Sequence, residues 1–233
     1  MVDRIHSYFR SLGLENAEAE HLHQRYYKEY GLAIRGLVRH HTIDPLDYDQ
    51  KCDASLPLQK VLRPDPKVVA MMKRIDKRKT RIFALTNAYK VHARRVLSLL
   101  QLDSIVEGIV YCDYANPELY VDLRAVQITS SSCKPEPEFF LAAQEAVRAS
   151  PNIRHYFVDD SLANIKQALR LGWQDSVHFD ETLKLQHPET SKEGVVLISN
   201  LLHLQMAWPD IFESPNEPAA APFADKPASL QAI

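Results

Sequence analysis

Apolar positions along this chain follow two patterns, one at helical spacing and one in short uninterrupted runs. In the first sixty residues the spacing is helical, and the first apolar face comprises Ile5, Tyr8, Phe9 and Leu12. Further along, short apolar runs long enough for one buried strand alternate with helical segments. The expected strands are 82–85, 105–111, 156–158, 176–179 and 195–198, and the expected helices between them are 66–75, 92–100, 137–148 and 162–172.

The alternation of strand and helix predicts an α/β fold with a doubly wound parallel sheet and right-handed crossovers. We expect residues 1–62 to form a separate helical cap and residues 63–212 to form the core. Residues 213–233 hold several prolines among alanines and few large apolar side chains, which predicts a disordered tail.

The composition of the chain argues against two classes of function, binding to nucleic acid polymers and binding to membranes. The chain has 233 residues, of which 45% are hydrophobic and 25% charged, and its formal net charge is -2. This balance argues against binding a nucleic acid polymer or a membrane surface. The three cysteines, Cys52, Cys112 and Cys133, form no CxxC pair. Sparse cysteines, and the absence of an apolar leader in the first ten residues, predict a cytoplasmic or nuclear protein.

Two adjacent carboxylates end the expected strand 156–158. Asp159 and Asp160 precede a helical segment, so they are expected at the carboxyl edge of the sheet, where α/β folds bind ligands. Two neighbouring carboxylates repel each other unless a cation lies beside them, and Mg²⁺ prefers such oxygen ligands. The alternative is that both carboxylates only cap the following helix.

Two further features lie at strand ends or just before a helix. Thr86 and Asn87 end the strand 82–85, and a hydroxyl followed by main-chain N–H groups suits a phosphate. Lys134 precedes a helix that begins with proline, and its ammonium could neutralise phosphate charge. Each feature alone is also explained by an ordinary turn or a solvated lysine, but their combination with the acidic pair is specific.

Aromatic and cationic residues mix in the segment RYYKEYGLAIRGLVRHH. Such a mixture can hold a flat base by stacking and a phosphate by charge. The simpler interpretation is an amphipathic helix pair with half-buried tyrosines. Asp47 and Asp49, further along, are expected in a surface loop.

At this point the chain resembles the haloacid dehalogenase-like hydrolase superfamily, and within it the fungal and plant pyrimidine 5′-nucleotidase branch. The similar segments are RYYKEYGLAIRGL, FALTNAYKVHA, GIVYCDY, CKPEPEFF and YFVDDSLANI, and the resemblance covers about residues 1–212. It implies that Thr86, Asn87 and Lys134 bind the phosphate, with Lys134 also catalytic. It further implies a Mg²⁺ held by Asp160 with support from Asp159 and Asn164, and specificity residues Tyr27, Lys28 and Arg35 in the cap.

The chain departs from that family in two places. The family places its nucleophile and general acid in an Asp-x-Asp motif that ends a first strand before the cap, and the printed sequence begins within the expected cap. We therefore expect the sequence to be an incomplete version of a working enzyme, with the strands 82–85 and 156–158 flanking the missing one. Extra residues at 120–132 are either a real surface loop or a translated intron.

Three functions follow from these observations. The first is a Mg²⁺-dependent phosphomonoesterase that hydrolyses nucleoside 5′-monophosphates, a class of small phosphorylated metabolites. The second is a catalytically inactive relative that binds phosphate or a protein, favoured by the absent Asp-x-Asp. The third, a dehalogenase of the same superfamily, fits less well because those enzymes do not need the metal that the acidic pair suggests.

Overall fold

The computed structural model describes residues 1–115, 132–149 and 153–213. Its helices are α1 (Val2–Ser11), α2 (Asn16–Tyr30), α3 (Ala33–His40), α4 (Pro45–Lys51), α5 (Leu58–Val61), α6 (Pro66–Lys73), α7 (Lys90–Leu99), α8 (Pro137–Ala146), α9 (Leu162–Arg170) and α10 (Leu204–Ala207), with 3-10 turns η1 (Leu201–His203) and η2 (Pro209–Ile211). Its strands are β1 (Phe83–Thr86), β2 (Gly108–Tyr111), β3 (Tyr156–Asp159), β4 (Asp175–Phe179), β5 (Glu189–Thr190) and β6 (Val196–Ile198). None of the helices in these ranges has the length and apolar character needed to cross a bilayer.

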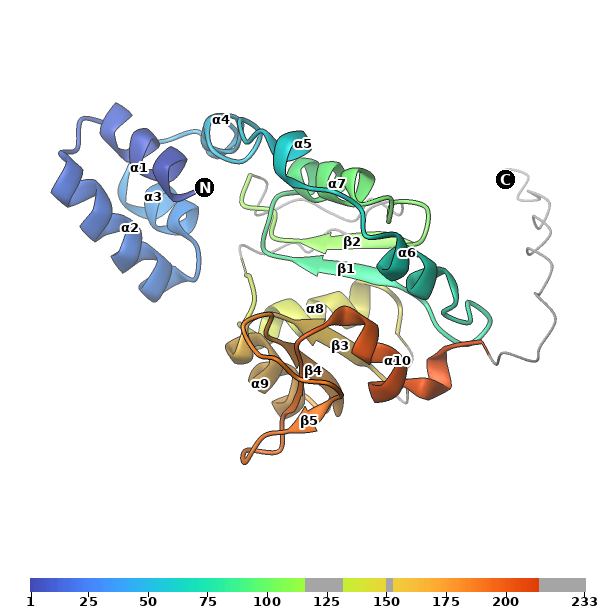
Figure 1. Ribbon diagram of the computed structural model, residues 1–233. Coiled ribbons are helices and arrows are strands. Elements are labelled where there is room, and N and C mark those ends of the chain that lie inside the picture. The colour runs from blue at the N-terminus through green and yellow to red at the C-terminus, as the bar shows by residue number, and fades with distance from the viewer. Residues whose placement is uncertain (116–131, 150–152, 214–233) are drawn as a thin grey trace, which may run out of the picture.

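Helices α1, α2 and α3 form a helical unit at one end of the molecule, and α4 and α5 lead from it to α7 (Figure 1). We use the name cap below for α1 to α4 only. Helices α1, α2, α3 and α4 pack on one another around Phe9, Leu37 and Tyr26. The expected helical character of this region is confirmed. The expectation that Asp47 and Asp49 lie in a surface loop is wrong, because both belong to α4 and Asp49 is buried.

Asp49 is buried because its partner lies in the core. Its Oδ1 accepts a hydrogen bond from the hydroxyl of Tyr114, at 3.2 Å, just after β2. The two residues are sixty-five positions apart, and the polar sequence around Asp49 does not indicate that they are in contact. Burial raises the pKa of the Asp49 carboxyl group and that of the Tyr114 hydroxyl.

The strands are parallel except for one, and the expected α/β class is confirmed. They form two sheets within the described residues, one with the order β1-β2 and one with the order β3-β4-β6-β5. β1 pairs with β2 in register from Phe83 opposite Gly108, and β3 pairs with β4 from Tyr156 opposite Asp175. The antiparallel edge strand β5 was not expected, because its two exposed residues, Glu189 and Thr190, carry no apolar signal.

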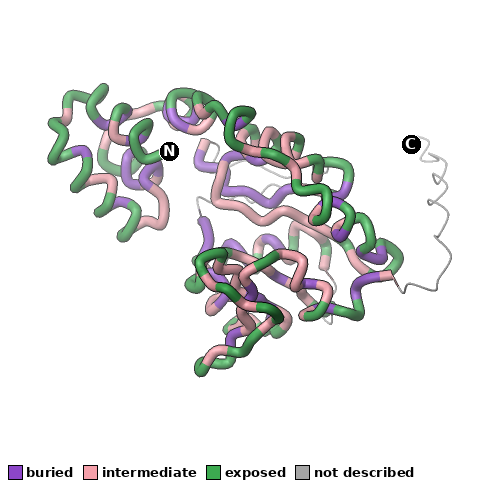
Figure 2. The backbone as a smooth tube through the Cα atoms, viewed as in Figure 1, coloured by how far each residue is buried: buried purple, intermediate pink, exposed green. Residues whose placement is uncertain are grey.

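A cavity of about 570 Å³ separates the two sheets, and we call it the slot. Residues of β1, β3 and α8 line it. All four residues of β1 are only half-buried, whereas three of the four in β2 are fully buried (Figure 2). A strand inside a parallel sheet covered by helices is normally buried on both faces, so the partial exposure of β1 reflects the open slot beside it.

Helix α8 connects the two sheets across one side of the slot. Arg81, just before β1, donates a hydrogen bond to the carbonyl of Val147, and Gln144 Nε2 lies 3.3 Å from His155 Nε2, just before β3. On the side of β3, a cluster of apolar side chains packs α8 and α9 on the sheet; its members are Phe140, Phe157, Ile165, Ala168, Trp173 and Val195. The packing of α8 against both sheets therefore holds the two sheets in their relative position.

The charged segment Lys77-Arg78-Lys79 supplies partners for a buried carboxylate. The side chain of Asp76 is only 1% exposed, and its carboxylate accepts hydrogen bonds from the Arg78 guanidinium at 2.9 and 2.8 Å. Lys79 Nζ lies 3.4 Å away. Hydrogen bonds from Arg78 hold the pKa of Asp76 well below its usual range.

Substituting Asp76→Asn tests this ion pair. Because the pKa of Asp76 is lower in the folded chain than in the unfolded one, the carboxylate stabilises the fold above about pH 4, and this contribution is lost as the pH falls further. We expect D76N to lower the melting temperature clearly at neutral pH and progressively less below about pH 4. The exposed Asp103→Asn is the control, and an effect of D76N that does not change with pH would contradict the pairing.

Substituting Gly36→Ala tests the packing of α3 on α2. Alanine normally stabilises a helix relative to glycine by about 1 kcal/mol. Here a Cβ at position 36 would lie 2.1 Å from Cγ of the buried Tyr26, so we expect the opposite sign, a loss of about 1–3 kcal/mol in the free energy of unfolding. Chemical denaturation measures this, and Tyr26→Ala in the same chain should remove most of the penalty specific to G36A.

Candidate functional site

The side chain of Lys134 joins the carboxyl ends of β1 and β3. Its Nζ donates to the carbonyl oxygen of Leu85, at 2.8 Å, and to Oδ2 of Asp159, at 2.5 Å. The side chains of Lys134 and Asp159 are only 9% and 6% exposed. A buried ammonium needs such partners, because an unpaired charge in an apolar interior is costly.

The turn after β1 holds the main chain of Lys134. Asn87 uses both ends of its amide, donating from Nδ2 to the Lys134 carbonyl at 2.9 Å and accepting from the Lys134 N–H at 2.7 Å. Beside it, the Thr86 hydroxyl oxygen accepts a hydrogen bond from the N–H of Ala88, at 3.1 Å. Thr86 and Lys134, forty-eight positions apart in sequence, are therefore neighbours at one edge of the molecule.

The two adjacent carboxylates have different environments. Asp159 Oδ1 accepts hydrogen bonds from the N–H of Ser161, at 2.9 Å, and from Nδ2 of Asn164, at 2.8 Å. Both of its oxygens are thus engaged, in a turn that precedes α9, whose N-cap is Ser161. Asp160 is exposed, and its main-chain carbonyl lies 3.1 Å from Nε2 of His178.

These positions bear on the expected Mg²⁺ site. No group of three His, Cys, Asp or Glu residues suited to a metal occurs among the residues that the structure describes. Mg²⁺, however, keeps several waters and is often held by one or two carboxylates together with oxygens of a substrate phosphate. The exposed carboxyl group of Asp160 suits that kind of site, and its neighbour in sequence, Asp159, is bonded to Asn164.

The loop that carries Lys134 is also tied to the cap. Arg35, on α3, donates from Nη1 to Oε1 of Glu136 at 2.7 Å, to the carbonyl of Tyr30 at 2.6 Å, and to Cys133 Sγ at 3.1 Å. The other oxygen of Glu136 accepts from the Cys133 N–H at 2.9 Å. Arg35, expected as a specificity residue, is therefore engaged in holding the cap on the Lys134 loop.

Gly31 lies at the same contact between cap and core. It ends α2 in the left-handed conformation, with φ of 75°. A Cβ at this position would lie 3.0 Å from Cys133 Sγ, so the end of α2 rests directly against the loop. Tyr27 and Lys28, the other expected specificity residues, lie on the last turn of α2 and are exposed, Tyr27 to 64%.

Sequence reasoning missed Glu136 and the Leu85 carbonyl. Glu136 had a usable signal, because it follows Cys133 by three positions and a Glu at that spacing often bonds back to a main-chain N–H. A carbonyl has no side-chain signature at all. The extra residues expected at 120–132 fall almost wholly outside the described residues.

The cysteines beside this edge are poor nucleophiles. All three cysteines of the chain are buried and free. Burial raises the pKa of the Cys133 thiol and raises that of Cys112 to about 12. The chemistry available at this edge therefore rests on the ammonium of Lys134, the turn at Thr86 and the carboxyl group of Asp160.

Comparisons with known proteins agree with this geometry. The family model described as haloacid dehalogenase-like hydrolase matches residues 3–172. "Phosphate metabolism protein 8" of Saccharomyces cerevisiae is 34% identical over 189 residues, which cover 78% of this chain and 56% of that protein. The chain thus spans little more than half the length of this curated relative.

A solved structure from Thermotoga maritima, assigned as a β-phosphoglucomutase, is 15% identical and covers 86% of this chain and 82% of its own. Its TM-score is 0.49, and a likeness at this level carries no argument about activity. The family match and the identity to the yeast protein are sufficient by themselves. The chain belongs to the haloacid dehalogenase-like hydrolase family.

Proposed function

We propose that this site belongs to a Mg²⁺-dependent phosphomonoesterase that acts on small phosphorylated metabolites, with pyrimidine nucleoside 5′-monophosphates as the substrate class. The observation that carries the proposal is the bonding of Lys134 to Asp159, the neighbour of Asp160, and to the carbonyl of Leu85, the neighbour of Thr86. Hydrolases of this family supply the chemical class, and the resemblance to the pyrimidine 5′-nucleotidase branch supplies the substrate.

The phosphate would lie between the turn after β1 and Lys134. The Thr86 hydroxyl and the N–H groups that follow it offer donors, with Asn87 fixing the loop from behind. Of the three N–H donors of Lys134, two are used by Leu85 and Asp159, which leaves one for a phosphoryl oxygen. Tyr27, Lys28 and Arg35 remain our candidates for contacts to the rest of the substrate.

A divalent cation would be held by Asp160, with Asp159 and Asn164 supporting that carboxylate. When bound, Mg²⁺ neutralises the negative charge that develops on a phosphoryl group during transfer. The side chains around the cation hold one another in position. Asn164 and the N–H of Ser161 orient the Asp159 carboxylate, and Asp159 in turn orients Lys134.

A second candidate function is binding without turnover. Phosphoryl transfer through a covalent intermediate needs a free attacking carboxylate, which the family provides in its Asp-x-Asp motif. The single Asp-x-Asp of the printed sequence is Asp47-Tyr48-Asp49, and it lies on α4. Asp159 is already held by three donors. These facts favour a phosphate-binding or protein-binding role for the chain as printed.

Phosphate release from UMP and CMP distinguishes the two functions. The assay compares this chain with any longer product of its gene, with Mg²⁺ and with a chelator. For an active form, we expect Asp160→Asn to reduce kcat at least about a hundredfold, because it weakens charge stabilisation in the transition state. Asp103→Asn, on an exposed turn, is the matched control.

Release that persists without Mg²⁺, or that D160N leaves unchanged, would contradict the phosphomonoesterase proposal. Saturable binding of UMP measured by calorimetry, with no release from any form, would instead establish the binding role. Neither result depends on how well the chain discriminates between bases.

The two neighbouring carboxylates should respond differently to substitution. Asp159→Asn leaves a buried Lys134 ammonium without its counter-charge, so we expect a loss of about 3–5 kcal/mol in the free energy of unfolding. Asp160→Asn alters an exposed side chain and should change stability by less than about 0.5 kcal/mol. Urea denaturation of both variants measures this, and equal losses would show that the burial of Asp159 does not determine its contribution.

A further inference from the structure

We propose that Arg35 and Glu136 are positioning residues for Lys134, so that its ammonium is fully held in place only while the cap rests on the core. The pair acts on Lys134 through the turn that carries it and does not itself touch the reacting phosphate. The catalytic side of this inference rests on the phosphomonoesterase proposal, whereas its structural side is testable without turnover.

The turn that carries Lys134 is closed by Glu136. The N–H of Glu136 donates to the carbonyl of Cys133 at 2.8 Å, and the Cys133 N–H donates to Oε2 of Glu136 at 2.9 Å. Lys134 follows Cys133 directly, so it lies at the tip of this turn. A hydrogen bond from a main-chain N–H to a carboxylate is stronger than one between neutral groups. The Glu136 side chain therefore helps to set the shape of the turn.

Glu136 directs its carboxylate away from the helix that it precedes. It is the N-cap residue of α8, yet within the described residues 132–149 its side chain accepts no hydrogen bond from that helix. A polar side chain at an N-cap ordinarily satisfies one of the first N–H groups and so stabilises the helix. The two oxygens of Glu136 instead bond to Cys133 and to Arg35. The residue thus joins the turn to the cap.

The cap itself orients Arg35 toward Glu136. Its neighbours on α3, Ile34 and Leu37, are buried in the cap, so its main chain moves with that unit. Nη1 donates to the Tyr30 carbonyl at 2.6 Å and to Oε1 of Glu136 at 2.7 Å, and only 19% of the side chain is exposed. Little side-chain freedom remains to be lost, so this pair is more rigid than a solvated ion pair.

Direct packing accompanies the ion pair. Cys133 is fully buried, and its Sγ lies 3.1 Å from Nη1 of Arg35. A Cβ at Gly31 would lie 3.0 Å from the same sulfur. The end of α2 and the start of α3 thus contact the residue that precedes Lys134. A shift of the cap relative to the core must therefore disturb the turn.

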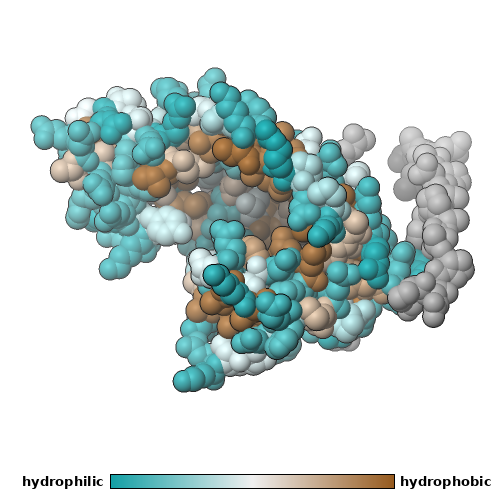
Figure 3. Space-filling model, viewed as in Figure 1, coloured by the Kyte–Doolittle hydropathy of each residue, from teal (hydrophilic) through white to brown (hydrophobic). Residues whose placement is uncertain are grey.

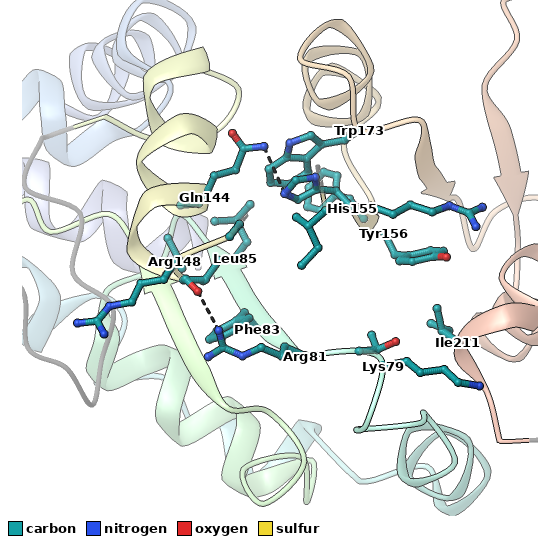
Figure 4. A pocket seen from close by; sticks show the side chains of 18 of the residues that line it. Lys79, Arg81, Phe83, Leu85, Gln144, Arg148, His155, Tyr156, Trp173 and Ile211 are labelled. Atoms are coloured by element: carbon teal, nitrogen blue, oxygen red, sulfur yellow. Dashed lines mark hydrogen bonds between the residues drawn. The ribbon is translucent and has the colours of Figure 1, made fainter. Parts of the chain in front are cut away.

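Beyond the turn, the chain enters a helix that the core holds without the cap. Apolar side chains gather in the hollow between the two sheets, and α8 lines part of it (Figure 3). Figure 4 shows the attachments of α8 and of the residue after it, with Gln144 next to His155 and Arg81 bonded to the carbonyl of Val147. Because α8 is anchored in this way, a movement of the cap acts mainly on the turn with Lys134 at its tip.

The position of the Lys134 ammonium matters for the proposed chemistry. Nζ bonds to the Leu85 carbonyl and the Asp159 carboxylate, and its third N–H is the one left for a phosphoryl oxygen. Stabilising the charge of a transition state requires donors that are already in place, and a displacement of about 1 Å can lower the rate about a hundredfold. Loosening of the turn by the cap would therefore lower turnover.

The alternative role for Arg35 is direct contact with the substrate, as its place in the cap predicts. Its Nη1 is already shared among three acceptors, on Tyr30, Cys133 and Glu136. Substrate contact through this atom would break the bond that holds the turn. The two roles also differ in kinetics. A residue that binds the substrate changes KM, whereas one that acts only in the transition state lowers kcat and kcat/KM together.

Acetylation of Lys134 by acetic anhydride tests the structural side on this chain. Mass spectrometry measures its labelling rate relative to that of the exposed Lys67 in the same molecule. We expect Arg35→Ala to speed the labelling of Lys134 about threefold or more, and Glu136→Ala at least as much, because each removes a charge-assisted bond from the turn. Arg25→Ala, which removes an exposed cap arginine with its ion pair inside α2, is the matched control and should change nothing.

The double variant R35A/E136A shows whether Arg35 acts through Glu136. If it does, adding R35A to E136A changes the labelling rate by less than about twofold. Effects that multiply would overturn the proposal, as would unchanged labelling of Lys134 in R35A. If circular dichroism shows that R35A unfolds the cap, Arg35→Gln gives the same comparison, since it can still donate to the Tyr30 carbonyl but lacks the charge that pairs with Glu136.

Kinetics in a longer, active product of the gene test the catalytic side. We expect R35A to lower kcat for UMP about fivefold while KM changes by less than about twofold. A rise in KM at unchanged kcat would assign Arg35 to substrate contact and overturn the positioning role. If no form releases phosphate, the phosphomonoesterase proposal fails, and the labelling of Lys134 still decides whether the cap positions it.

Discussion

The buried ammonium of Lys134 is the interaction on which the arrangement of the site depends. A cation with 9% exposure must be matched by oxygen atoms nearby, and here they come from two different sheets. Pairing with Asp159 and with the Leu85 carbonyl therefore fixes how far apart β1 and β3 lie at their carboxyl ends. The same constraint sets the distance between the turn at Thr86 and the exposed Asp160.

The loop that carries Lys134 is held from both sides, and this couples the cap to the core. Asn87 holds its main chain from the core, while Arg35 holds Glu136 from the cap. Arg95, on α7, adds a third attachment by donating to the carbonyls of Ala54 and Leu56 between α4 and α5. These bonds act together with a shared apolar cluster, which includes Tyr48 and Cys52 of the helical unit and Tyr111 and Tyr114 of the core.

The slot shows how the two sheets remain together without pairing directly. Edges of sheets are normally covered or paired, because their free main-chain groups attract other strands. Here α8 crosses between the sheets through the hydrogen bond of Arg81 with Val147 and the contact of Gln144 with His155. Trp173, stacked on His155, closes the wall beside β3. Helix packing thus holds the two sheets on either side of the slot.

The sequence by itself determined the class of the fold and most of its elements. The helical spacing at Ile5, Tyr8 and Phe9 and the buried runs that became β1 and β3 were sufficient, because local periodicity reports which face of an element is buried. Strand ends also placed Thr86 and Asp160 at one edge, because parallel strands share the direction of their carboxyl ends. The strand β5 was missed, since two polar residues have no periodicity.

Only the tertiary structure decided the roles of the polar side chains. It showed that Asp159 neutralises Lys134, that Asn87 supports a loop, and that Asp49 is buried against Tyr114. The physical reason is that a polar residue has no preferred face or spacing of its own. Its environment depends on partners that are distant in sequence, and those partners become known only when the packing of the apolar residues has brought them together.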